Sequence, residues 1–283
     1  MPINKPIISS RNLSKKMNDP CLVIIDTRFS LFDPDVGHNL YKKSHISGAI
    51  YAHLDNDLAG TITSSSGRHP LPDIKDICSR LKLWGINNSS NIVVYDDNNS
   101  AFAARLWWML RWLGHSNVSV LNGGFDDWCK NNYPINSDIP KYKKGNFECK
   151  ILNDIIWSSE MIMNWLSSSK DFVLVDARDS NRYKGIEEPI DKIPGHIPGS
   201  INIPFTEFLR NDGSWKDEGE IISIWKRFNI NNRSEWGVMC GSGVTACHLS
   251  ISAEIANINP PKLYPGSWSE WISDKSRPIT YEK

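Results

Sequence analysis

The sequence predicts an α/β protein in which one unit, a parallel sheet flanked by helices, occurs twice. Short runs rich in Val and Ile alternate with amphipathic stretches, which is the pattern of consecutive β-α-β units. The same signals also recur in the same order roughly 150 residues later, which indicates an internal repeat. A length of 283 residues suits two domains of ordinary size.

Four signals carry the repeat. Their first and second copies lie at 23–28 and 173–178, at 45–50 and 196–201, at 92–95 and 236–239, and at 122–128 and 265–271. The first pair is an apolar strand ending in an acid and an arginine, and the second is the HI-x-G motif. The third pair is again an apolar strand, followed by Asp96 in the first copy and by Cys240 in the second.

Helices are expected between these strands. Residues 101–113 have helical periodicity and stop at Gly114, a favoured residue just beyond a helix end. Residues 118–121 then read as a strand. In the second half, 220–228 and 246–256 are the expected helices.

The domain boundary is expected in a polar, irregular stretch that contains Pro134 and Pro140. We predict an N-terminal domain over residues 1–140, a linker over 141–157 and a C-terminal domain over 158–283. The second domain is expected to be the catalytic one.

Charge and hydropathy exclude several classes of protein. Lys and Arg number 32, as do Asp and Glu, and no basic block occurs, so nucleic acid is not an expected partner. No apolar run approaches the roughly 18–20 residues that span a bilayer, so no membrane association is expected. The first eighteen residues are basic and faintly resemble a transit peptide. We expect a cytoplasmic monomer, with a mitochondrial location as the alternative.

The six cysteines are too few for a disulfide scaffold, and they form no paired CxxC units of a zinc site. A reducing compartment is the default, in which one or two thiols matter chemically. Cys247 is expected to be buried on the helix 246–256, and the same structural interpretation applies to Cys21, Cys78, Cys129 and Cys149.

Cys240 is the exception. It follows the strand 236–239 and begins a loop of small residues, Gly241, Ser242, Gly243, Val244 and Thr245, which leads into a helix. Such a loop can turn successive backbone N–H groups inward to hold an anion, and the helix N-terminus adds partial positive charge. Both features favour a thiolate, the nucleophilic form of cysteine. We therefore predict a catalytic Cys240 with the other loop residues binding substrate.

These features resemble the two-domain rhodanese family of sulfurtransferases over nearly the whole chain. The HI-x-G motifs, a cysteine in the second copy alone and the loop CGSGVTA carry the resemblance. Members that use thiosulfate typically have a basic pair after the cysteine, whereas the neutral loop is similar to that of the 3-mercaptopyruvate sulfurtransferases. The resemblance implies that sulfur passes from 3-mercaptopyruvate to a Cys240 persulfide and then to a thiol acceptor such as thioredoxin or glutathione, or to cyanide. Pyruvate is released, and no metal or organic cofactor is implied.

The resemblance also implies the residues that bind substrate. Arg182 is expected to hold the substrate carboxylate, and Arg178 is a second candidate that follows its strand directly and more often pairs internally. The family's second binding arginine falls at Ile190 in this sequence, so Lys192 is a possible substitute.

A proton-transfer trio is implied as well. The resemblance implies that Ser242 is linked to His69 and Asp55 from the first domain. Such an arrangement can transfer a proton, because a histidine oriented by a carboxylate can pass a proton through a hydroxyl. His45 and His196 lie in the motif that both halves share, so we interpret them as structural. The first domain has Asp96 in place of the thiol and is expected to be catalytically silent.

Of three alternative functions, the sequence argues against the first two but leaves the third open. A cysteine phosphatase needs C-x5-R, and the sixth residue after Cys240 is Ala246. A non-catalytic binding module would be expected to have lost Cys240. Thiosulfate as the sulfur donor stays open because Ile190 replaces the family arginine.

Overall fold

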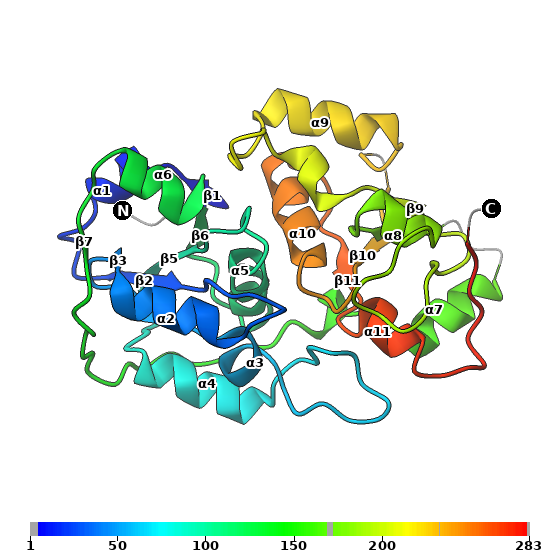
Figure 1. Ribbon diagram of the computed structural model, residues 1–283, viewed down its shortest axis with the longest axis horizontal. Coiled ribbons are helices and arrows are strands. Elements are labelled where there is room, and N and C mark those ends of the chain that lie inside the picture. Colours follow the sequence, from blue (N-terminus) through cyan, green and yellow to red (C-terminus); the bar gives the residue numbers. More distant parts are fainter. Residues whose placement is uncertain (1–4, 169–171, 232, 282–283) are drawn as a thin grey trace. The chain divides into compact units, whose positions relative to one another are not determined.

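The computed structural model describes residues 5–168, 172–231 and 233–281, and it contains two compact units (Figure 1). Unit 1 comprises Met1–Gly60, Pro72–Leu152 and Leu209–Trp215. Unit 2 comprises Thr61–Leu71, Asn153–Phe208 and Lys216–Lys283. Neither unit is continuous in sequence, unlike the predicted ranges 1–140 and 158–283. The change from unit 1 to unit 2 after Leu152 falls inside the predicted linker.

Unit 1 is built on a five-stranded parallel sheet. Its strands, in spatial order, are β1 (Ile7–Ile8), β6 (Val118–Leu121), β5 (Asn91–Tyr95), β2 (Leu22–Asp26) and β4 (Ile50–Tyr51). The central β5 is buried at every residue, as expected of a parallel strand covered on both faces. The helices of unit 1 are α1 (Ser10–Ser14), α2 (Asp35–Lys43), α3 (Leu54–Asp57), α4 (Ile74–Leu83), α5 (Ala103–Trp112) and α6 (Gly124–Lys130). A small antiparallel pair joins β3 (His45–Ile46) to β7 (Ile135–Asn136).

Unit 2 repeats this plan with a four-stranded parallel sheet. Its strands, in spatial order, are β11 (Lys262–Leu263), β10 (Trp236–Met239), β8 (Val173–Asp176) and β9 (Ile201–Asn202). Its helices are α7 (Ser159–Leu166), α8 (Ser180–Lys184), α9 (Glu218–Arg227), α10 (Ala246–Ile255) and α11 (Ser267–Trp271), with short 3-10 turns at η1 (Asn153–Ile155) and η2 (Phe205–Phe208). The predicted duplicated α/β fold is confirmed.

The predicted elements match closely, and two of the helices begin at residues other than the expected ones. The helix expected over 220–228 begins two residues earlier, at α9. The helix expected over 101–113 begins two residues later, at α5. The cause is Asp96, whose carboxylate accepts hydrogen bonds from the backbone N–H groups of Phe102 and Ala103, at 2.8 Å each. These bonds hold the chain in a turn just before the helix. No helix in the described part of the chain is both long and apolar enough to cross a membrane.

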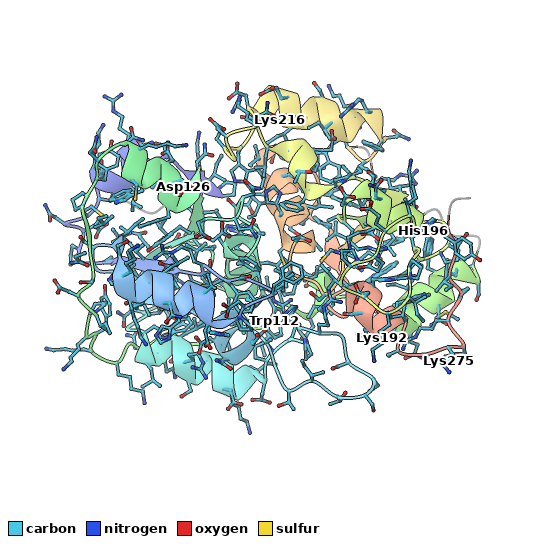
Figure 2. All side chains as sticks on the ribbon, viewed as in Figure 1. Trp112, Asp126, Lys192, His196, Lys216 and Lys275 are labelled. Carbon is cyan, nitrogen blue, oxygen red and sulfur yellow. A yellow bond between two sulfur atoms is a disulfide. The ribbon has the colours of Figure 1, made fainter. Side chains whose placement is uncertain are left out.

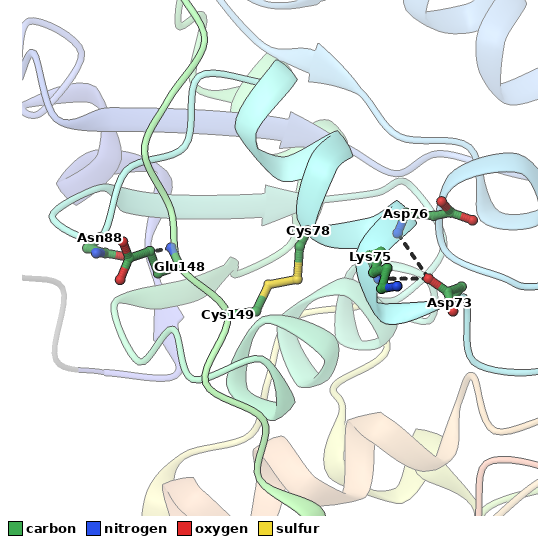
Figure 3. The surroundings of a disulfide bond; sticks show 7 residues. All are labelled: Asp73, Lys75, Asp76, Cys78, Asn88, Glu148 and Cys149. Carbon is green, nitrogen blue, oxygen red and sulfur yellow. Dashed lines mark hydrogen bonds between the residues drawn. A yellow bond between two sulfur atoms is a disulfide. The ribbon is translucent and has the colours of Figure 1, made fainter.

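A disulfide joins Cys78 of α4 to Cys149, which corrects the prediction that both are buried structural thiols (Figure 3). Residues 145–150 run along unit 1, where the Gly145 N–H donates to the Lys82 carbonyl at 2.8 Å and the Glu148 N–H to the Asn88 side chain at 2.9 Å. This path brings the two Cα atoms to 6.2 Å, a bridgeable distance.

The expected burial of the other two cysteines of unit 1 is also wrong. Cys21 is exposed and Cys129 is half-buried, and both are free thiols. Cys21 lies in the turn before β2 and Cys129 on α6 next to the buried Trp128, and the count and spacing of cysteines alone could not show this.

Breaking this disulfide is expected to destabilise unit 1. The bond spans 71 residues of sequence, and closing a loop of that size in the unfolded chain stabilises the folded state by about 4 kcal/mol. Urea denaturation of Cys149→Ser, or of the wild type with dithiothreitol, should show this loss. Trypsin should also cut faster after the exposed Lys141, Lys143 and Lys144.

Cys21→Ser, which removes an exposed free thiol of the same unit, is the matched control and should behave as the wild type. An unchanged unfolding midpoint on reduction would contradict the disulfide.

Candidate active site

The loop that follows β10 is held in place by the start of α11. Cys240 is buried, and its N–H donates to the Ser267 hydroxyl at 3.0 Å. The N–H groups of Trp268 and Ser269 donate in turn to the carbonyls of Cys240 at 3.0 Å and of Gly241 at 2.9 Å. Three consecutive residues therefore fix the backbone on which the predicted nucleophile stands.

Glycine is required at Gly243. Its φ is +73°, and an added Cβ would lie 2.3 Å from the Pro265 carbonyl oxygen. The tight turn there leads into α10, whose N-terminus begins at Ala246. Cys247 is buried in the first turn of α10, where its thiol donates to the Gly243 carbonyl at 3.3 Å. Its predicted structural position is confirmed.

Two guanidinium groups lie beside Gly241. A Cβ at this position would meet Nη2 of Arg68 at 2.9 Å and Nη2 of Arg182 at 3.3 Å. The missing side chain thus lets both arginines approach the residue next to Cys240. Burial lowers the pKa of Arg68, and the negative charge of a Cys240 thiolate opposes that shift. The two groups are therefore close enough to interact electrostatically.

Two buried carboxylates orient these arginines. Asp191 pairs with Nη1 of Arg68 and, at 3.0 Å, with Nη2 of Arg182. Glu188 accepts from Nε of Arg182 at 3.0 Å and from the Ile190 and Asp191 N–H groups at 3.1 and 3.0 Å. The acidic stretch around Ile190 therefore folds into a support for Arg182 and Arg68.

Arg68 is the site residue that the sequence reasoning missed. The family's second binding arginine is replaced by Ile190 in this sequence, and the possible substitute named above is Lys192. Lys192 is exposed (Figure 2). The second guanidinium comes instead from the segment 61–71, more than a hundred residues earlier. The signal in the sequence is that Arg68 directly precedes His69, the predicted proton-transfer residue.

Arg178 forms a buried ion pair within unit 2. Its guanidinium pairs with Asp176 at 2.7 Å, donates to the Gly195 carbonyl at 2.8 Å and lies over the Trp268 ring at 4.8 Å. Arg28 pairs with Asp26 in the same way in unit 1, at 2.7 Å. Because the pairing recurs in both units, we interpret Arg178 as structural and assign it no contact with substrate.

His69 and Ser242 are brought together as predicted: Nδ1 of His69 lies 2.7 Å from Oγ of Ser242, and both side chains are buried. One expectation is corrected, because residues 61–71, which carry His69, are part of unit 2. Asp55 belongs to α3 of unit 1, where its N–H donates to Nδ1 of His53 at 3.1 Å. Its link to His69 stays a prediction.

The histidines of the repeated HI-x-G motif are structural, as predicted. His45 contacts the Tyr41 carbonyl at 2.7 Å and stacks on its ring, with 4.0 Å between the centroids. His196 does the same with Tyr183, at 2.8 and 3.8 Å. Each histidine thus ties its motif to the preceding helix.

The equivalent loop of unit 1 closes around its own carboxylate. Besides the two bonds at the start of α5, Asp96 accepts from the N–H groups of Asn98 and Ser100, at 2.9 Å each. Four inward-pointing N–H groups therefore surround one fixed anion. In the described part of the chain, no group of three or more His, Cys, Asp or Glu side chains could hold a metal ion.

A family model described as "Rhodanese-like domain" matches residues 9–131 and 161–274. The chain belongs to the rhodanese family. A "Probable 3-mercaptopyruvate sulfurtransferase" of Pseudomonas aeruginosa is 36% identical, over 96% of this chain and 97% of its own length. A "Putative thiosulfate sulfurtransferase SseB" of Mycobacterium tuberculosis is also 36% identical, over 90% and 89%.

Among solved structures, the 3-mercaptopyruvate sulfurtransferase from Leishmania major superposes with a TM-score of 0.87 at 29% identity, covering 98% of this chain and 76% of that one. The predicted resemblance to the two-domain sulfurtransferases is confirmed, and the chain is similar to enzymes named for either sulfur donor.

Proposed function

We propose that this rhodanese-family chain is a sulfurtransferase that takes its sulfur from 3-mercaptopyruvate. The observation that carries the proposal is the 2.7 Å contact between Nδ1 of His69 and Oγ of Ser242, the residue two positions after Cys240 in the loop. Such a pair can deliver a proton to a leaving group. An enolate leaving group needs that proton, whereas sulfite leaves thiosulfate as a stable anion.

The substrate carboxylate is proposed to bind between Arg68 and Arg182. Nη1 of Arg68 is occupied by Asp191, but its buried Nε has no hydrogen-bond partner among the described residues. Nε and Nη2 lie on the same edge of a guanidinium and can hold a carboxylate through two parallel hydrogen bonds. Since Nη2 points to Gly241, a carboxylate held there lies next to the nucleophile.

In the proposed reaction, the Cys240 thiolate attacks the sulfur of 3-mercaptopyruvate. A sulfur–sulfur bond forms as the carbon–sulfur bond breaks, and the electron pair of that bond goes to the pyruvate enolate. The enolate carbon receives a proton through Ser242 and His69, which gives pyruvate. An acceptor thiolate then attacks the outer sulfur of the persulfide and releases the Cys240 thiolate.

The proposed acceptor is a thiol such as glutathione or thioredoxin. The reaction uses the chain's own thiolate, hydroxyl, imidazole and guanidinium groups, so it includes no cofactor. Cys240, Ser242, His69, Arg68 and Arg182 all belong to unit 2 of one chain, so we propose that a monomer is sufficient.

Thiosulfate is the second candidate donor. The two guanidiniums beside Gly241 also suit the sulfonate group of thiosulfate, and the Mycobacterium tuberculosis relative is named for that donor. However, the loop itself supplies no cation, since Gly241 to Thr245 are all neutral. We therefore expect thiosulfate to be the poorer donor.

Steady-state kinetics with both donors and one thiol acceptor test the assignment. We expect kcat/KM for pyruvate release from 3-mercaptopyruvate to exceed that for sulfite release from thiosulfate by at least about 100-fold, since assisted proton transfer contributes on this scale. Ser242→Ala should lower the rate with 3-mercaptopyruvate and leave the thiosulfate rate unchanged. A clear preference of the wild type for thiosulfate would overturn the proposal.

A further inference from the structure

The start of α11 contacts the nucleophile loop and the segment that carries Arg68 at the same time. The Ser269 N–H donates to the Gly241 carbonyl at 2.9 Å, and its Oγ accepts from the Arg68 N–H at 3.1 Å. One residue therefore connects the backbone beside Cys240 to the backbone of the arginine that reaches over it.

The two backbones are also closely fitted at this point. A Cβ on Gly67 would lie 2.5 Å from the Gly266 carbonyl oxygen and 2.9 Å from the Ser269 hydroxyl. Glycine at this position lets residues 67 and 68 lie directly on the turn that begins α11. The Ser269 hydroxyl accepts a hydrogen bond from the N–H of the next residue, Arg68. This bond fixes the position of the Arg68 backbone, from which the guanidinium extends.

We propose that Ser269 is a positioning residue for substrate binding, acting through Arg68. Its hydroxyl sets the position of the Arg68 backbone relative to Gly241, so that the free edge of the guanidinium faces the site before the substrate arrives. A binding group held in place loses less conformational entropy when the substrate binds. The inference rests on the proposed function and adds a residue that the reaction itself does not touch.

The expected effect is on KM. Loss of one hydrogen bond of this kind weakens binding about 5- to 10-fold. The rate constant kcat is expected to change less than about twofold, because His69 has its own contact with Ser242 at 2.7 Å. A merely structural role would instead lower the melting temperature without changing KM.

The experiment measures kcat and KM with 3-mercaptopyruvate for the wild type, Ser269→Ala and Ser269→Thr. Thr keeps the hydroxyl and should restore KM to near the wild-type value. Ser276→Ala is the matched control, because Ser276 is exposed and bonds to Asp274. The double variant with Arg68→Gln supplies the decisive comparison: once Arg68 is lost, Ser269→Ala should raise KM no further.

An unchanged KM in Ser269→Ala overturns the inference, as does an equal effect with and without Arg68. Failure of the proposed function gives a different result. If the wild type accepts thiosulfate alone, the donor assignment falls, and the KM for thiosulfate then tests Ser269 in the same way, because that donor is also an anion.

Discussion

Replacing Cys240 with serine is expected to lower sulfur transfer more than about 1,000-fold, the scale on which enzymes respond to loss of a nucleophile. A hydroxyl is protonated at neutral pH and cannot carry the transferred sulfur as a persulfide. Thiocyanate formation with cyanide as the acceptor measures the loss. The binding residues are expected to remain in place because the backbone of Cys240, which the substitution keeps, makes the hydrogen bonds to Ser267 and Trp268.

Cys21→Ser is the matched control for this variant, since Cys21 is a free, exposed thiol of unit 1. It should keep full activity. Residual activity of Cys240→Ser within tenfold of the wild type would mean that another group is the nucleophile.

Replacing Arg68 with alanine is expected to raise KM for 3-mercaptopyruvate about 10- to 100-fold, because charge-assisted hydrogen bonds to a buried carboxylate are strong. The loss also leaves Asp191 with Arg182 as its remaining partner at this site, so Arg182 is drawn away from the substrate. Arg68→Lys should recover only part of the affinity, since an ammonium group cannot form two parallel bonds. Steady-state kinetics give both values.

Lys192→Ala tests the rival assignment in the same assay. Lys192 is the possible substitute for the family arginine that Ile190 replaces, and its side chain is exposed. Its substitution should leave KM unchanged. A larger effect of Lys192→Ala than of Arg68→Ala would reverse the two roles.

The fold could be predicted because its signals are local and occur twice. Apolar runs such as 236–239 read directly as buried parallel strands, and the loop of small residues after them indicates a nucleophile at the carboxyl end of the sheet. The contact between His69 and Ser242 was also anticipated, on family resemblance. These features depend on residue types in a fixed order.

The features that could not be predicted depend on the path of the chain in space. Arg68 reaches the site because residues 61–71 belong to unit 2, although the residues on either side of them belong to unit 1. No local sequence pattern indicates which unit this segment joins. The Cys78–Cys149 bond arises because residues 145–150 follow α4 and the turn after it. In both cases, residues far apart in sequence meet through irregular segments, for which periodicity gives no information.

Intact-mass measurement of the thiol-reduced protein, before and after treatment with 3-mercaptopyruvate, detects the proposed Cys240 persulfide itself. We expect a gain of one sulfur atom per chain, removed by cyanide and absent in Cys240→Ser. One pyruvate should be released per sulfur gained. A Cys240→Ser variant that still gains the sulfur, or a wild type that gains it from thiosulfate but not from 3-mercaptopyruvate, would contradict the proposed mechanism.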